Sequence, residues 1–321
     1  MIRALIWFVL IGIFLVSSFV GAVDLHLKEI LNANSLDSTI FFELRLPRVL
    51  FAFFAGSILG LSGLLFQTLF RNALMTPYTL GISSGAVLGA GIAIKLGLST
   101  LIFGIGAISL FGFMGAIFTV FLLVYLAQFL KSSQQESLLL LGIALSLFYT
   151  SALMVIFYLG DAMQNDTLIR FTMGSLSIIG WSYPLALGLI ASLVFLSIFF
   201  YRFELQLLSV SEEQAKLKGV NSSRVTLLLL IVSSLGIGTL VSISGPIGFI
   251  GLIVPHIVAK LYPTTVASRI TKTALFGGLF LVMCDTITRG IATQSELPIG
   301  IITAMIGAPF FIYLIITRSS K

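Results

Sequence analysis

Charged side chains are scarce in this sequence. Lys, Arg, Asp and Glu make up 9% of its 321 residues, whereas apolar residues make up 58%. Ordinary soluble domains carry roughly a quarter charged residues, so water is not the main solvent of this chain. The apolar residues run in continuous blocks rather than in alternation, which favours membrane-spanning helices over membrane strands.

Residues suited to metal binding and catalysis are equally few. Cys284 is the one cysteine, which excludes an intramolecular disulfide and a cysteine metal cluster, and His26 and His256 are the two histidines. The sequence contains no G-x-x-x-x-G-K-[ST] nucleotide loop and no H-E-x-x-H zinc motif. We therefore expect a chain that is not an enzyme, has no ATPase site of its own, and binds no cofactor or metal.

Ten apolar blocks predict the spans of an all-α membrane protein, since a span needs about 20 apolar residues. They are Leu5–Val23, Val49–Leu69, Leu80–Ile94, Leu101–Phe129, Leu138–Leu159, Pro184–Tyr201, Leu227–Val241, Ile247–Leu261, Ala274–Ile291 and Pro298–Ile316. The first block is longer than the apolar core of a signal peptide, which favours a span. Ser244-Gly245-Pro246 divides the seventh block from the eighth.

The basic residues predict the orientation of these spans. Twelve of the eighteen Lys and Arg residues lie on the side of both termini and six on the opposite side. Because cytoplasmic loops are the richer in Lys and Arg, we expect both termini in the cytoplasm. The basic residues are scattered among apolar blocks, so a nucleic-acid partner is not expected. No polar region is large enough to fold alone, and residues 1–321 are expected to form one transmembrane domain.

An internal polar segment, residues 203–223, predicts a rigid loop. Its centre reads Ser211-Glu212-Glu213-Gln214-Ala215-Lys216-Leu217-Lys218-Gly219-Val220. Ser211 and Gln214 have the spacing of a capping box, and Gly219 can supply a left-handed stop. We expect a helix of about two turns, followed by a second helix start at Asn221. It is either a handle for a separate motor or an ordinary capped loop helix.

Ionisable residues at membrane depth are almost absent apart from Asp285. Secondary transporters and pumps keep several such groups there to couple ions to substrate. A single acid instead predicts local pairing, with Arg289 one helical turn away as the expected partner. The pattern indicates a conduit driven by a separate motor.

Several segments together resemble the FecCD family of ABC importer permeases. They are Leu44-Arg45-Leu46-Pro47-Arg48, Gly56 to Gln67, Arg71-Asn72, Leu80 to Ala86, Met173 to Leu176, Glu212 to Val220, Gly245 to His256, Glu296 to Gly300 and Ile306 to Tyr313. The chain departs from the family pattern at Ala73, where a proline is usual.

The resemblance implies a ten-helix fold of the type II, cobalamin-permease-like kind in a bacterial cytoplasmic membrane. It also implies a homodimer, or a heterodimer with a paralogue, that has the pathway at its interface. Cytoplasmic ATPase subunits would dock on residues 211–220, and an external substrate-binding protein would dock on Arg45, Arg48 and Arg289. For these arginines the alternative is a side chain that reaches toward lipid headgroups.

The remaining candidate residues are expected to line the pathway or to pack helices. They are Gly56, Gly60, Gly63, Ser83, Ser84, Pro255 and His256. Ferric siderophore is the expected substrate, with cobalamin, haem and molybdate as alternatives. Two other classes stay open: a secondary transporter or channel that works without ATPases, and an intramembrane enzyme that depends on Asp285 or His256.

Overall fold

The computed structural model describes residues 2–21, 23–32, 35–98, 101–102, 105–127, 129, 134–291 and 297–319. The apolar helices are α1 (Ile2–Ser17), α4 (Leu46–Leu69), α5 (Ile82–Lys95), α6 (Ala107–Ala127), α7 (Gln134–Leu159), α9 (Ser182–Phe200), α12 (Ser222–Ser244), α13 (Ile250–Leu261), α14 (Val266–Ile291) and α15 (Ile299–Ser319). The shorter elements are α2 (Leu27–Ile30), α3 (Leu36–Thr39), the π-helix η1 (Ile40–Arg45), α8 (Ala162–Met173), α10 (Arg202–Val210) and α11 (Glu212–Leu217). Strands β1 (Leu101–Ile102) and β2 (Ile105–Gly106) pair in an antiparallel hairpin.

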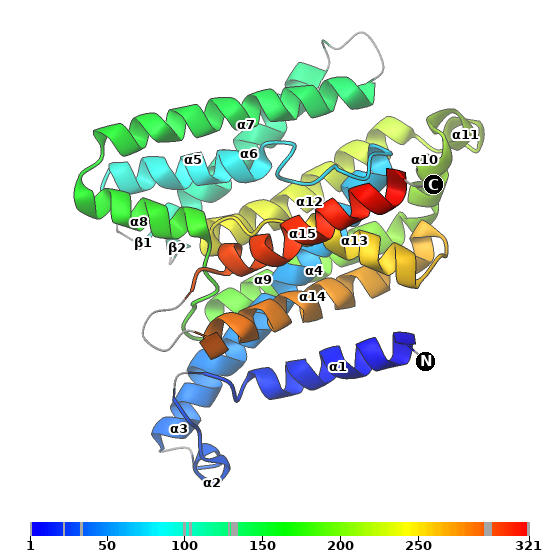
Figure 1. Cartoon of the computed structure of the whole chain (residues 1–321). Coiled ribbons are helices and arrows are strands. Elements are labelled where there is room, and N and C mark those ends of the chain that lie inside the picture. Colours follow the sequence, from blue (N-terminus) through cyan, green and yellow to red (C-terminus); the bar gives the residue numbers. More distant parts are fainter. Residues whose placement is uncertain are drawn as a thin grey trace.

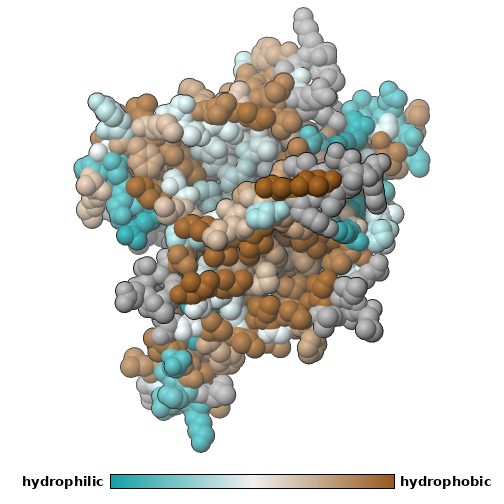
Figure 2. Space-filling model, viewed as in Figure 1, coloured by the Kyte–Doolittle hydropathy of each residue, from teal (hydrophilic) through white to brown (hydrophobic). Residues whose placement is uncertain are grey.

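The helices form one bundle with two polar ends (Figure 1). Both termini lie at the end that carries α10 and α11, here called the α11 end; α3, α8 and the hairpin lie at the opposite, α8 end. Figure 2 shows brown, apolar side chains across the middle of the bundle and teal, polar ones gathered at α2 and α3, at α8, and near α11. This is the distribution expected of a protein that spans a bilayer.

The all-α membrane fold agrees with the expectation from sequence. Within the described residues, six helices are long and apolar enough to cross a membrane, and four apolar helices are shorter. The predicted break between the seventh and eighth blocks is confirmed, since α12 ends at Ser244 and Gly245 adopts a positive φ of 70°. A left-handed glycine followed by Pro246 cannot continue a helix.

Several predicted boundaries were wrong. The first span ends at Ser17 rather than Val23, and the fourth begins at Ala107, because β1 and β2 occupy the start of its block. The segment between the predicted fifth and sixth spans contains α8, a polar helix whose start is capped reciprocally by Asp161 and Gln164. Apolar block length alone does not detect such a helix.

Helix α4 is the centre of the bundle. It packs against α14, α9 and α13, and most of its side chains are buried. It continues directly from α3 and η1, so the helix begins well before the predicted Val49. Pro47 lacks a backbone donor for the Glu43 carbonyl, and the N–H of Gly180 donates to that oxygen instead at 2.9 Å.

The α8–α9 connection ties helices together at the α8 end. The Ser175 N–H donates to the Ser244 carbonyl at 2.7 Å, and the Ile299 N–H donates to the Gly174 carbonyl at 3.2 Å. These bonds satisfy backbone groups at the last residue of α12 and the first of α15, which an apolar setting requires. The α8 end is therefore a connected assembly rather than a set of independent loops.

Candidate functional site

A small cavity lined by hydroxyl groups lies between α5 and α7. Its volume is about 290 Å³, and its lining residues are Tyr78, Ser83, Ser84, Val87, Tyr149, Thr150, Leu153 and Pro246. All of these side chains are neutral. Two of the predicted pathway residues, Ser83 and Ser84, are thus brought together at one cavity.

The hydroxyls around this cavity are only partly satisfied within the chain. Ser83 is 1% exposed, and its hydroxyl lies beside that of Tyr78 without the geometry of a hydrogen bond. Tyr149 and Thr119, in contrast, share a hydrogen bond of 3.1 Å. Buried polar groups without partners are costly and are found mainly where water or a solute can reach them. The cavity can therefore offer neutral donors and acceptors to a passing solute.

Gly56, Gly60 and Gly63 lie in close contacts between helices and are not lining residues of this cavity. A Cβ atom on Gly56 would overlap the Gly277 carbonyl of α14, and one on Gly63 would overlap the Gly251 carbonyl of α13. Such small residues allow two helix backbones to approach closely, as in other membrane bundles. The geometry supports packing as the role of these glycines.

Pro255 and His256 reshape the hydrogen bonding of α13. Pro255 has no N–H, so the Gly251 carbonyl lacks its helical donor, and Nε2 of Gln67 on α4 donates to it at 3.1 Å. Nδ1 of His256 lies 2.8 Å from the Leu252 carbonyl oxygen, which requires the proton on Nδ1. Neither residue lines the hydroxyl cavity. The Gln67 bond made possible by Pro255 joins α4 to α13, whereas the His256 bond lies within α13.

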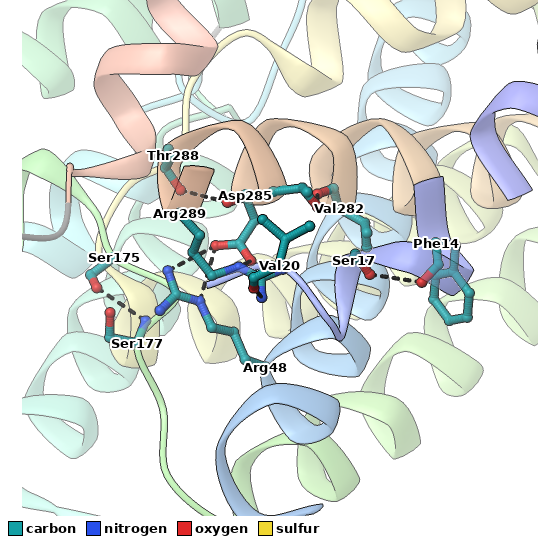
Figure 3. Close-up of polar contacts among 11 residues, drawn as sticks. Phe14, Ser17, Val20, Arg48, Ser175, Ser177, Val282, Asp285, Thr288 and Arg289 are labelled. Carbon is teal, nitrogen blue, oxygen red and sulfur yellow. Dashed lines mark hydrogen bonds and ion pairs between the residues drawn. The ribbon is translucent and has the colours of Figure 1, made fainter. Parts of the chain in front are cut away.

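An ionic cluster lies at the α8 end (Figure 3). Arg48 on α4 donates to Oδ1 of Asp285 on α14 through Nε at 3.1 Å and Nη2 at 2.9 Å. Nε of Arg289 lies 3.0 Å from Oδ2 of the same carboxylate, and its Nη1 donates to the Val20 carbonyl at 2.8 Å. The exposed fractions of the three side chains are only 10%, 1% and 7% for Arg48, Asp285 and Arg289. The predicted Asp285–Arg289 pair is present, and Arg48 joins it.

Arg45 holds the segment that follows α1. Its guanidinium donates to the carbonyl oxygens of Phe19 and Val23, and Asp24 and Asp37 are near enough to interact with it electrostatically. Arg45, Arg48 and Arg289 therefore lie together at the α8 end. They are buried and bonded within the chain, so none of them reaches toward lipid headgroups.

The predicted internal loop folds as two short helices, α10 and α11. Ser211 is the N-cap of α11, but its side chain accepts from the Glu213 N–H at 3.2 Å rather than from that of Gln214, and the Ser211 N–H donates to the Leu207 carbonyl, so the helix is capped without the predicted capping box. Gly219 has a φ of 80°, which is the left-handed stop expected. Asn221 caps α12 by accepting from the Arg224 N–H at 3.1 Å.

The internal loop is also bonded to a long span. Oε1 of Gln206 on α10 accepts from the backbone N–H of Val266, the first residue of α14, at 2.7 Å. The first N–H groups of any helix lack partners within that helix, so Gln206 caps α14 from a different element. Because α14 carries Asp285 and Arg289 near its other end, one helix joins the α11 end to the ionic cluster.

The chain is similar to known proteins over nearly its whole length. The sequence profile of the FecCD transport family matches residues 9–317, nearly the full length. The chain belongs to the FecCD transport family. As a member of this family it is a multi-pass, membrane-spanning permease subunit of an ABC importer, a class that works with ATPase and substrate-binding partners.

Individual relatives of this FecCD chain have similar lengths. The "Hemin transport system permease protein HmuU" of Yersinia pestis is 34% identical over 309 residues, covering 95% of this chain and 92% of that protein. The "Probable iron chelatin transport system permease protein" of Helicobacter pylori (strain 26695) is 35% identical over 291 residues, covering 91% and 85%. A solved structure described as an inward-facing "metal-chelate type ABC transporter" has a TM-score of 0.82 at 29% identity, covering 96% of this chain and 97% of that one.

Other FecCD relatives are named for further substrates. One protein of Haemophilus influenzae is named for molybdate import, and one of Halobacterium salinarum for cobalamin import. Membership in the family therefore gives the class of transporter without giving the substrate.

Sequence reasoning missed three polar residues of this FecCD chain. Gln67 and Gln206 each bond to a backbone group on a distant helix, and Tyr149 lines the cavity. A glutamine in an apolar block was the available signal for Gln67, because a buried amide needs a partner. No local sequence pattern indicates the roles of Gln206 and Tyr149.

Proposed function

We propose that this chain forms half of the passage of an importer for intact ferric siderophores, and that two copies enclose the passage. The observation that carries the proposal is the neutral, hydroxyl-lined cavity beside α7. Hydroxyl groups can contact the oxygen-rich surface of a chelate without binding it tightly, and transport requires a site that the solute can leave. Haem, cobalamin and molybdate are the alternative substrates.

The two-copy arrangement is supported by the surface of α7. Leu140, Leu147, Met154 and Tyr158 follow one stripe of this helix, and between 65% and 89% of each is exposed. The cavity is next to this helix, so a second copy on α7 would enclose a passage there. A stripe of exposed apolar side chains along a spanning helix is suited to packing against another helix.

The motor would act at the α11 end. The sequence has no nucleotide loop. At the end where both termini lie, α11 is capped by Ser211, and α10 is bonded to α14 through Gln206. We propose that this end is cytoplasmic, that ATPase subunits dock on residues 211–220, and that movement passes through the Gln206–Val266 bond into α14.

The substrate-binding protein would act at the α8 end. Arg45, Arg48 and Arg289 are the proposed contacts, and their support is a shared location at this end. Since all three already have partners in the chain, an acidic surface would have to compete with Asp285 or with backbone carbonyls. Docking would then rearrange the cluster rather than add to it.

Uptake by the reconstituted complex tests the substrate. The permease, its ATPase and its binding protein are placed in vesicles and supplied with ferric hydroxamate, ferric catecholate, haem, cobalamin or molybdate. ATP-dependent accumulation of a ferric siderophore, with little of the other solutes, is the expected result. Preferential uptake of cobalamin, haem or molybdate would contradict the siderophore assignment and leave the importer class intact.

A further inference from the structure

A groove between α9 and α12 at the α11 end lies away from the hydroxyl cavity. It is an open groove of about 550 Å³, and its lining includes Leu196, Phe199 and Phe200 of α9, Arg202, and Leu228 of α12. Leu196 is 61% exposed and Phe200 is 72% exposed on a helix that is long and apolar enough to cross a membrane. The groove therefore faces lipid where α9 leaves the bilayer.

Arg202 lies at the mouth of this groove in a fixed orientation. Its guanidinium carbon is 4.3 Å from the centre of the Phe199 ring and 4.5 Å from that of Phe203, and Nη1 donates to the Phe199 carbonyl at 3.1 Å. Within the described part of the chain, no carboxylate forms an ion pair with it. Aromatic rings on a guanidinium hold it without neutralising it, so most of its N–H groups stay available to an anion.

A second cation, Arg224, lies on α12 one helical turn before Leu228, on the side toward the start of this helix. Arg224 precedes Leu228 by four residues on α12, so the two share a face of the helix. Arg224 is exposed, and none of the ion pairs among the described residues includes it. Arg202 thus lines the groove, and the helical spacing places Arg224 one turn beyond the lining residue Leu228 on the same face of α12.

We propose that this groove binds an anionic phospholipid, with the phosphate at Arg202 and Arg224 and one acyl chain along Leu196, Phe200 and Leu228. Basic pockets between spans on the cytoplasmic side are suited to anionic headgroups. The volume lies inside the range of about 300–1,000 Å³ typical of small-molecule sites. A soluble protein is the poorer fit, because the exposed leucine and phenylalanine lie within the last turns of a spanning helix. The proposal takes the α11 end as cytoplasmic, as proposed above, and does not depend on which substrate the passage carries.

Lipid binding to the assembled transporter tests this site. Native mass spectrometry of the purified complex would compare short-chain phosphatidylglycerol with short-chain phosphatidylcholine, and would add inorganic phosphate as a competitor. The wild-type complex is expected to retain phosphatidylglycerol preferentially, and inorganic phosphate at the same concentration is expected not to displace it. Arg202→Gln should weaken phosphatidylglycerol binding about five-fold, whereas Arg202→Lys should keep most of the preference.

Two further variants separate the parts of the site. Leu228→Trp fills the groove without touching either charge, and it should lower the binding of both lipids. Arg170→Gln removes a cation at the opposite end of the molecule, where Arg170 pairs with Asp166, and should change nothing. Equal binding of the two lipids by wild type, displacement of the lipid by phosphate, or unchanged binding in Leu228→Trp would each overturn the proposal.

Discussion

Asp285 is the residue on which the ionic cluster depends. It is 1% exposed and faces Arg48 and Arg289 at once. Asp285→Asn would leave two buried guanidinium groups without a counter-charge, and removing one partner of a buried ion pair costs about 3–5 kcal/mol. We expect a clear fall in the thermal unfolding temperature of the purified protein.

The matched control for this substitution is Asp166→Asn. Asp166 also pairs with an arginine four residues later, but the two side chains are 62% and 78% exposed. Exposed pairs contribute little to stability, so the unfolding temperature should hardly move. If Asp285→Asn melted at the wild-type temperature too, the cluster would not have the structural role described here.

The cluster also shows how much can be predicted at the scale of single residues. The pairing of Asp285 with Arg289 follows from their spacing on one helix. Arg48 could not be predicted as a partner, because it is separated from Asp285 by 237 residues and only the packing of α4 on α14 brings them together. Reversing all three arginines to Glu would gather carboxylates around a buried aspartate, so it would test folding rather than docking.

A substitution at Gly63 tests the close packing of α4 against α13. A Cβ atom there would overlap the Gly251 backbone, which no side-chain rotation can relieve. Gly63→Ala should therefore push α4 and α13 apart and lower the yield of monodisperse protein in detergent, at a cost of about 1–3 kcal/mol. Gly12→Ala in α1 is the control, since a Cβ atom there meets nothing within 4 Å. Equal yields from the two variants would refute close backbone packing at Gly63.

Among the helices, α10 and α14 form the connection that matters most to the proposed power stroke. Gln206→Leu removes the acceptor of their shared hydrogen bond, and Val266→Pro removes the donor at a helix position that tolerates proline. Both variants should keep ATP hydrolysis by the assembled complex and lose much of its stimulation by the binding protein. Combining them should cost little more than either alone, because they remove the same bond.

Gln206→Glu supplies the rescue. A carboxylate can still accept from the Val266 N–H, and it lies favourably at a helix N-terminus. Stimulation should return with this variant. If the leucine and proline variants stayed fully coupled, movement would reach α14 by another route.

Helices with local sequence signals could be predicted, whereas elements that depend on contacts in the folded bundle could not. The spans follow from apolar block length, and the α11 helix follows from Ser211 and Gly219, because both signals are local. Helix α8 also has a local signal, the Asp161–Gln164 capping box, but its polar sequence hides it from a search for apolar blocks. The π-helix depends on Pro47 together with the Gly180 bond, which forms only in the folded bundle.

At the scale of the whole molecule, the shared location of the termini has a direct test. Both termini lie at the α11 end, and the predicted topology assigns twelve of the eighteen basic residues to the side of the termini. A reporter fused after Lys321 that is active only in the cytoplasm should therefore be active, and one that is active only outside should be silent. The reverse pattern would invert the orientation and place α10 and α11 beyond the reach of an ATPase.

The deciding measurement is active uptake by the permease with and without its partners. Vesicles containing the purified chain alone, and vesicles containing the chain with its ATPase and binding protein, would receive the same radiolabelled ferric chelate and ATP. Accumulation against a gradient should occur only in the complete assembly and stop when ATP hydrolysis is blocked. Uphill accumulation by the chain alone would contradict a passage that depends on attached subunits for its energy.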